Sequence, residues 1–235
     1  MILAVIDTST RFAGVGVMDD AGKRATHAWR SDQNHGRELM PALVKCLTEL
    51  SLAPAGITHV AVALGPGGFS AVRVGISVAL GLVVARKLPV LGVPTHAIEA
   101  EPHRDLVSGE TPVYSLIPAG RQELSWMRHG GTLDGADTDS QTGVSSADEL
   151  VGRLERGALL CGEACDLVVG LVEESRFAGS AEPEFTGHAP FARRDPNSLL
   201  DIAVAEFREG TSTPYEELRP IYARPPSISR PKQAT

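Results

Sequence analysis

The chain opens with Ile2-Leu3-Ala4-Val5-Ile6-Asp7-Thr8-Ser9-Thr10, and this stretch decides how the residues after it can fold. Residues 2–6 are continuous and aliphatic, which predicts a fully buried strand that ends where the sequence turns polar. Residues 12–18 (Phe-Ala-Gly-Val-Gly-Val-Met) predict a second strand, residues 19–23 a hairpin turn, and residues 24–30 a third strand. The chain therefore begins as a β-meander.

Helical patterns and buried strands alternate after this meander. A polar start at residues 32–38 precedes a helix that runs to about Leu50, with its apolar residues on one face. Residues 58–64 predict a buried strand, residues 71–86 a long apolar helix, and residues 89–93 a fifth strand. The order βββαβαβ indicates a mixed sheet with helices packed on it, an α/β fold.

A polar stretch, residues 101–111, interrupts this pattern and indicates a domain boundary. We expect one domain over residues 1–104 and a smaller, divergent one over residues 105–235. The second repeats the theme more weakly, with a loop rich in Gly, Asp and Thr at residues 131–143. Its expected elements are strands at 113–117, 123–128 and 158–161 and helices at 147–156 and 197–209.

The composition narrows the class of protein. Hydrophobic residues make up 43% of the 235 residues and the formal net charge is −7, so the chain is a poor candidate for a main nucleic-acid-binding surface. Its three cysteines, Cys46, Cys161 and Cys165, form neither a disulfide ladder nor a zinc set. The N-terminus lacks the pattern of a signal peptide, and no apolar run is long enough for a membrane span. We expect a soluble, cytoplasmic protein.

Two loops could hold a phosphate group. Asp7, Thr8 and Ser9 follow the first strand, where hydroxyls and amides can bind phosphate and a carboxylate can bind Mg²⁺ through water. The alternative is that they only satisfy the turn. Residues 65–70 (Gly-Pro-Gly-Gly-Phe-Ser) enter a helix, and Gly65, Gly67 and Gly68 allow close approach of another group. They match neither a P-loop nor a dinucleotide fingerprint, so a structural turn stays open as well.

The helix at residues 71–86 is apolar almost all round, which predicts that it is buried on more sides than one sheet provides. Small residues four apart, such as Gly75 and Ala79, would let another helix come close, although such stripes also serve packing within a domain. We expect a partner surface here together with the apolar face of residues 36–50. Its residues are His35, Leu39, Met40, Leu43, Phe69, Val72, Arg73, Ile76, Ala79, Leu80 and Val83.

Several motifs in order resemble one family. The opening at residues 2–10, the helix start His35-Gly36-Arg37-Glu38-Leu39-Met40-Pro41, and residues 65–75 (Gly-Pro-Gly-Gly-Phe-Ser-Ala-Val-Arg-Val-Gly) are similar to motifs of the TsaB (YeaZ) family. Residues 92–96 and the late Pro220-Ile221-Tyr222-Ala223-Arg224-Pro225 also match. At residues 118–124 the family usually shows Asp-Ala-Arg-x-x-Glu-Val, and this chain departs from that pattern.

The resemblance implies two domains of the actin-like ATPase (ribonuclease H-like) fold. It implies a non-catalytic subunit that pairs with the catalytic paralogue TsaD through helices of the first domain and is joined by the ATPase TsaE. Together they transfer threonylcarbamoyl to adenosine 37 of tRNA. This chain would carry no cofactor of its own, would meet tRNA only indirectly, and could form a homodimer when alone. TsaD's metal histidines lie one helical turn apart, whereas this chain has only His96 there.

Two other functions are open to a chain of this superfamily. An ATP-dependent small-molecule phosphotransferase would need a second glycine-rich loop for adenosine and a general-base Asp, and neither is evident in the sequence. A metallopeptidase would need the metal histidines that are missing around His96. The pattern favours a scaffold with little or no activity of its own.

Overall fold

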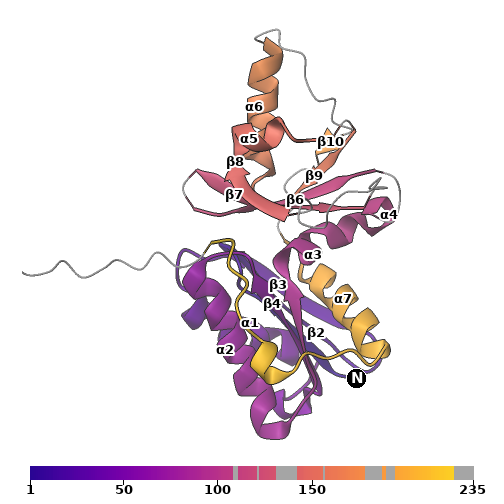
Figure 1. The fold of residues 1–235 in the computed structure, drawn as a ribbon. Helices are drawn as coiled ribbons and strands as arrows, with labels where there is room; N and C mark the ends of the chain where they lie inside the picture. Colours follow the sequence, from indigo (N-terminus) through magenta and orange to yellow (C-terminus); the bar gives the residue numbers. More distant parts are fainter. Residues whose placement is uncertain are drawn as a thin grey trace, which may run out of the picture.

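The computed structural model describes residues 1–107, 111–120, 122–130, 142–155, 157–177, 187–188 and 194–224. These residues form two five-stranded sheets, with strand orders β3-β2-β1-β4-β5 and β10-β9-β6-β7-β8. Each sheet is flanked by helices, and the sheets lie in separate halves of the molecule (Figure 1). The predicted α/β class with two mixed sheets is confirmed.

The first sheet follows the predicted meander. β1 (Leu3–Asp7) pairs antiparallel with β2 (Phe12–Met18), which pairs antiparallel with β3 (Arg24–Arg30). On its other side β1 pairs in parallel with β4 (His59–Gly65), and β4 with β5 (Val90–Pro94). All five residues of β1 are buried, because a central strand with helices on both faces needs no polar side.

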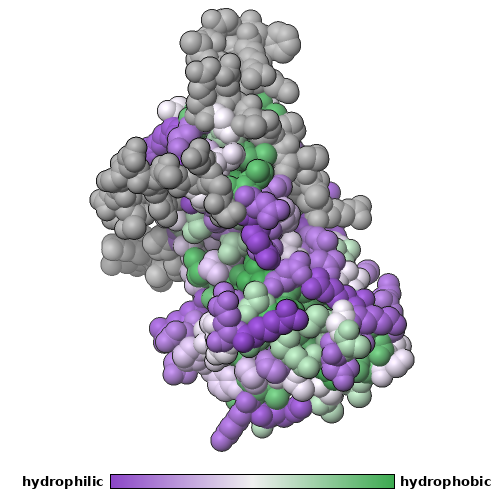
Figure 2. Space-filling view, turned by 90° about the vertical axis from the view of Figure 1, so that its right-hand side faces the viewer, coloured by the Kyte–Doolittle hydropathy of each residue, from purple (hydrophilic) through white to green (hydrophobic). Residues whose placement is uncertain are grey.

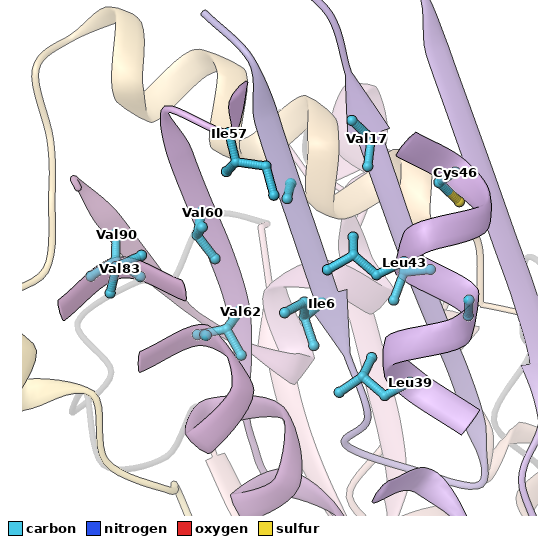
Figure 3. Close-up of a cluster of buried hydrophobic side chains, with 14 of the residues drawn as sticks. Ile6, Val17, Leu39, Leu43, Cys46, Ile57, Val60, Val62, Val83 and Val90 are labelled. Carbon is cyan, nitrogen blue, oxygen red and sulfur yellow. The ribbon is translucent and has the colours of Figure 1, made fainter. Parts of the chain in front are cut away.

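Two helices cover one face of this sheet, α1 (His35–Glu49) and α2 (Phe69–Val83), the latter continued by a short 3₁₀ turn, η2 (Val84–Arg86). Figure 3 shows Leu39 and Leu43 of α1 pointing toward the strands, among side chains such as Ile6 and Val62. The alternation of side chains along each strand sends Leu3, Val5 and their neighbours to the opposite face.

Helix α7 (Pro196–Arg208) covers that opposite face, although it comes from the far end of the chain. Glycines in β2 allow its close approach, because a Cβ on Gly14 would lie 2.7 Å from Pro196 Cγ. Residues after α7 also lie on the first sheet, where the Thr213 N–H donates to the Val90 carbonyl. The prediction that residues 105–235 form one domain is therefore wrong at its C-terminal end.

The second sheet is built around β6 (Val113–Pro118), which pairs antiparallel with β7 (Glu123–His129) and in parallel with β9 (Leu159–Cys161). β8 (Thr142–Ser146) and β10 (Gly187–His188) form its edges. Helices α5 (Ala147–Val151) and α6 (Cys165–Phe177) accompany it. Of these, β8, β10 and α6 were not predicted, and most of the predicted loop 131–143 lies outside the described residues.

The chain crosses between the sheets twice. The first crossing contains α3 (Thr95–Ala100), a 3₁₀ turn η3 (Glu101–His103) and α4 (Arg104–Val107), near the predicted boundary. The second crossing leads back to α7 and includes Arg194. Figure 1 shows α3 where the two halves meet, beside α7. Both crossings therefore meet close to the carboxyl end of β1.

Candidate functional site

The turn after β1 is closed by its own side chains. Asp7 Oδ1 accepts hydrogen bonds from the Ser9 amide at 2.9 Å and the Ser9 hydroxyl at 2.6 Å. Thr8 Oγ1 donates to the Ala71 carbonyl at 2.7 Å, at the start of α2. All three side chains are buried, with relative exposures of 3% or less. This turn is fixed by internal bonds and faces away from solvent.

The glycine loop before α2 lies directly against this turn. The Gly68 amide donates to the Ser9 carbonyl at 2.7 Å, and a Cβ on Gly67 would lie 1.9 Å from that same oxygen. Gly65 is required for a different reason. Its φ is +96°, and a Cβ there would lie 2.4 Å from the Ile221 carbonyl oxygen, so the C-terminal segment can pack only against a glycine. The structure thus brings five of the six predicted phosphate-site residues together and places Gly65 against the C-terminal segment.

A buried arginine, Arg194, lies against the Asp7 carboxylate. Its Nη1 donates to Asp7 Oδ2 at 3.0 Å and to Ser9 Oγ at 2.5 Å. Its Nε donates to Glu99 Oε1 at 3.0 Å, and its Nη2 donates to the same oxygen. The side chains of Arg194, Asp7 and Glu99 are 6%, 4% and 11% exposed. We call these three residues the ion triad.

Burial disfavours the charged forms of the triad side chains. The attraction between the guanidinium and the two carboxylates opposes this effect. Burial alone raises the pKa of Glu99, and the Arg194 guanidinium lowers it again in part. Burial also disfavours the guanidinium charge, but the Asp7 and Glu99 carboxylates more than compensate and raise the pKa of Arg194. A cation held between two buried carboxylates offsets part of the cost of burying their charges. Neither Arg194 nor Glu99 was predicted as a site residue, since no local pattern links residues 95 positions apart.

A cavity of about 890 Å³ lies beside the triad, between the two halves of the molecule. Residues of the first sheet's loops and of the start of α6 line it, among them Thr10, Arg11, Gly67, Gly68 and Glu163. Arg11 Nε donates to Glu163 Oε1 at 2.7 Å across this cavity. Of the predicted phosphate site, only Gly67 and Gly68 reach the cavity, whereas Asp7, Thr8 and Ser9 are sealed behind them.

A second polar cluster connects the first crossing, residues 95–107, which we call the hinge, to the second sheet. His96 on α3 contacts the Ser115 hydroxyl at 2.7 Å and the Ser125 hydroxyl at 2.9 Å, and His129 contacts Ser115 at 2.8 Å. Burial is the main cause that lowers the pKa of His96 to about 3, with smaller electrostatic contributions from His129 and Arg194. Burial lowers the pKa of His129 to about 4. Both imidazoles are therefore neutral and serve as hydrogen-bonding partners that dock the hinge.

The burial of side chains corrects the predicted partner surface. Six of its residues are in the hydrophobic core with exposures of 4% or less, and His35 is 8% exposed. The six core residues are Leu39, Leu43, Val72, Ile76, Ala79 and Val83. The Gly75–Ala79 stripe also faces inward, since a Cβ on Gly75 would lie 2.6 Å from Thr8 Oγ1. These residues support the sheet and cannot contact a partner.

The outward sides of the same helices remain uncovered. Met40 and Phe69, both predicted, are 39% and 43% exposed, and Val44 and Val84 are 44% and 51% exposed. Ser70, Ser77 and Gly81 line the same side of α2 at helical spacing, and no atom lies within 4 Å of a Cβ placed on Gly81. We call this surface the outward face: Gly36, Met40, Val44, Phe69, Ser70, Arg73, Ser77, Gly81 and Val84.

Helix α2 is strongly apolar and packs much of its apolar surface on the first sheet. Residues Phe69–Arg86 have a mean hydropathy of 1.7, enough by length and composition for a membrane span, and 33% of them are buried. Four further apolar residues are partly buried against the same core, namely Val74, Val78, Leu80 and Leu82. The buried stripe of α2 packs on the first sheet, as expected for a core helix. By contrast, Figure 2 shows the α7 side of the molecule, where hydrophilic residues are spread over the first domain among smaller hydrophobic areas.

An aromatic and cationic cluster lies at one end of the outward face and includes two of its residues. The Arg73 guanidinium lies 3.9 Å from the centroid of the Phe69 ring, and its Nε donates to the Tyr222 hydroxyl at 2.6 Å. The rings of Phe69 and Tyr222 are stacked with centroids 4.8 Å apart. The C-terminal segment thus supports one end of α2, and Arg73 keeps N–H groups available at the surface.

Comparison with known proteins gives this arrangement a family context. A family model of TsaD, the tRNA N6-adenosine threonylcarbamoyltransferase, matches residues 29–156, more than half of the chain. The Escherichia coli tRNA threonylcarbamoyladenosine biosynthesis protein TsaB is 27% identical over 231 residues, which is 95% of each chain. The protein of the same name from Bacillus subtilis is 22% identical over 174 residues, 74% of this chain and 76% of that protein.

The fold agrees with the sequence matches. The solved structure of YeaZ from Pseudomonas aeruginosa has a TM-score of 0.71 to this chain at 24% identity and covers 94% of this chain and 99% of its own. Both halves of the molecule therefore lie within the shared fold. The chain accordingly belongs to the family that the TsaD model describes, and within it to the TsaB (YeaZ) branch.

Proposed function

We propose that this chain is a non-catalytic subunit in the biosynthesis of tRNA threonylcarbamoyladenosine, and that it acts by pairing with a TsaD-like protein. One observation carries the proposal: the apolar side chains of Met40, Val44, Phe69 and Val84, on α1, α2 and η2, are 39% to 51% exposed. An exposed apolar surface of this kind is typical of a protein–protein interface. The TsaB name of the relatives supports the process, and the outward face supports the pairing.

The outward face has the features of a helix-packing surface. Its stripes on α1 and α2 combine exposed apolar residues such as Met40 and Val44 with small ones such as Ser77 and Gly81. Small residues let a second pair of helices approach closely, while the apolar residues contribute burial. At one end, Phe69 and Arg73 are residue types that often dominate binding energy at interfaces. A TsaD-like protein, which shares the fold of residues 29–156, is the partner that such a surface fits.

The ion triad supports a role without catalysis. In a phosphotransferase of this fold the Asp7 carboxylate would have to face a metal ion or a phosphate-bearing ligand, but here it is sealed and paired with Arg194. An ATP-dependent phosphotransferase is therefore the less supported function. We infer that ATP and Mg²⁺ are used by the complex and that this chain holds neither. A TsaE-like ATPase would join the pair, and tRNA would be met only through the partner.

The proposal also predicts where the protein works and how it assembles. A tRNA-modifying complex works in the cytoplasm, and the acidic chain, with a net charge of −7, would leave most of the tRNA contact to its partner. When no TsaD-like protein is present, the exposed outward face would favour a homodimer through the same surface. The two assemblies would then compete.

A matched pair of glutamate variants tests the pairing. Ser77→Glu places a carboxylate in the middle of the outward face, and Ala205→Glu places one at an exposed position of α7 on the other side of the first sheet. A charge buried without a counter-ion costs several kcal/mol. We expect Ser77→Glu to weaken binding of the host's TsaD-like protein by at least about 100-fold in calorimetry, and Ala205→Glu to leave it unchanged.

Both variants should keep the circular dichroism and unfolding midpoint of the parent, because both positions are exposed. Ala79→Glu would not be a valid test, since Ala79 is a core residue with 0% exposure and its charge would unfold the domain. Equal affinity of the Ser77→Glu and parent proteins for the partner would place the pairing surface elsewhere. Turnover of ATP by the pure parent chain, abolished by Asp7→Ala, would contradict the non-catalytic role.

A further inference from the structure

We propose that Arg194 is the chain's own cation at the end of β1, a positioning residue that takes the place of a bound ion and holds the start of α2 for partner binding. This inference rests on the proposed pairing through the outward face, and it adds a residue that the partner never touches. Arg194 lies behind the glycine loop and is 6% exposed. Its effect on binding must therefore pass through other residues.

The chemistry of the triad requires a cation. Asp7 and Glu99 place two carboxylates in a site from which water is largely excluded. Without a positive charge between them, burial and mutual repulsion would destabilise both ionised groups. In many proteins such a pair is satisfied by a metal ion. Here the guanidinium does so, with hydrogen bonds to both carboxylates and to Ser9.

The triad also joins three segments that are far apart in the sequence. Asp7 ends β1 of the first sheet, Glu99 is on α3 in the first crossing, and Arg194 is at the end of the second crossing, two residues before α7 begins. A single guanidinium therefore ties both crossings to the central strand.

A short chain of contacts leads from the triad to the outward face. Arg194 donates to the Ser9 hydroxyl, and the Ser9 carbonyl accepts from the Gly68 amide at 2.7 Å. Next to it, Thr8 Oγ1 donates to the Ala71 carbonyl. Gly68 and Ala71 flank Phe69 and Ser70 of the outward face, so the position of the turn sets the position of the first turn of α2.

Arg194→Ala tests this inference, with Arg194→Lys as the conservative variant. We expect Arg194→Ala to weaken binding of the TsaD-like protein by about tenfold in calorimetry. Hydrogen exchange should become faster at residues 68–72 of the free chain. Arg194→Lys keeps the charge and should retain most of the affinity. Guanidinium chloride at about 10 mM, far below denaturing concentrations, should restore binding by Arg194→Ala, whereas the same concentration of sodium chloride should not.

A neutral triple variant covers the case in which Arg194→Ala does not fold, because breaking a buried ion pair leaves uncompensated charge. Asp7→Asn with Glu99→Gln and Arg194→Met removes all three charges, and we expect it to fold but to bind the partner as weakly as Arg194→Ala. Full affinity and unchanged exchange at residues 68–72 in either variant would overturn the inference. So would a loss of affinity in Arg194→Ala that guanidinium fails to restore.

The two proposals fail in different ways. If the parent chain does not bind a TsaD-like protein at all, the proposed pairing is wrong, and hydrogen exchange with guanidinium rescue still reports on Arg194. If the parent binds and Ser77→Glu abolishes binding while Arg194→Ala binds normally, the pairing stands and the positioning role is wrong.

Discussion

At the scale of single residues, the hinge histidines make the stability of the chain depend on pH. His96 and His129 have folded-state pKa values lowered to about 3 and about 4 by burial, whereas an unfolded histidine titrates near pH ~6.5. Between these values the unfolded chain binds protons that the folded chain does not. Stability is therefore complete above about pH 6.5 and is lost as the pH falls through this window.

We expect the free energy of unfolding to fall between pH 6.5 and pH 4 by on the order of 1.4 kcal/mol for each histidine and each pH unit at most. Urea unfolding followed by circular dichroism at several pH values measures it. The double variant His96→Gln and His129→Gln serves as the control and should show a shallower pH dependence. The same slope in the variant and the parent would mean that these imidazoles do not carry the effect.

Two glycines with opposite surroundings give a second test at this scale. A Cβ on Gly67 would lie 1.9 Å from the Ser9 carbonyl oxygen, whereas a Cβ on Gly81 would meet no atom within 4 Å. Gly67→Ala should destabilise the chain beyond the ~3 kcal/mol that bounds most single substitutions. Gly81→Ala, inside α2, should stabilise it by about 0.5–1 kcal/mol. Thermal and urea unfolding measure both, and equal effects would contradict the packing at Gly67.

At the scale of elements, α7 decides which segments make up the first domain. Leu199, Leu200 and Ala203 of α7 are fully buried against the face of the first sheet that contains Leu3 and Val5. A fragment of residues 1–107 leaves that face bare and should bind the dye ANS and unfold without cooperativity. The same fragment joined through a Gly/Ser linker to residues 194–224 should unfold cooperatively. A cooperative transition in the short fragment would show that α7 is dispensable.

At the scale of the whole molecule, partner and nucleotide should affect stability differently. Anything that binds only the folded state raises the unfolding midpoint, by about 2.7 kcal/mol at 100 times its Kd. Because Arg194 neutralises Asp7, 1 mM MgATP, roughly the upper end of ordinary substrate affinities, should not shift the midpoint of the isolated chain. An excess of the TsaD-like protein should raise it. A clear rise with MgATP alone would reopen the phosphotransferase function.

The sequence by itself determined the strands and helices that residues 2–94 contribute to the first domain. The aliphatic run at residues 2–6, the glycine loop at 65–70 and the helical spacing of Leu39 and Leu43 are local signals, because strand and helix periodicity are written in neighbouring residues. The motifs at residues 65–75 and 220–225 also pointed to the TsaB family. The helices expected to form the partner surface were located correctly, but not the sides of those helices that remain exposed.

Only the tertiary structure decided which face of each helix is covered. An apolar helix offers several equivalent sides, and the sheet takes one of them, which buries Ala79 and leaves Ser77 and Gly81 exposed. The structure likewise brought Asp7, Glu99 and Arg194 together from segments separated by up to 187 positions. No periodicity or local motif encodes such a contact, because it depends on how both crossings return to the same strand end.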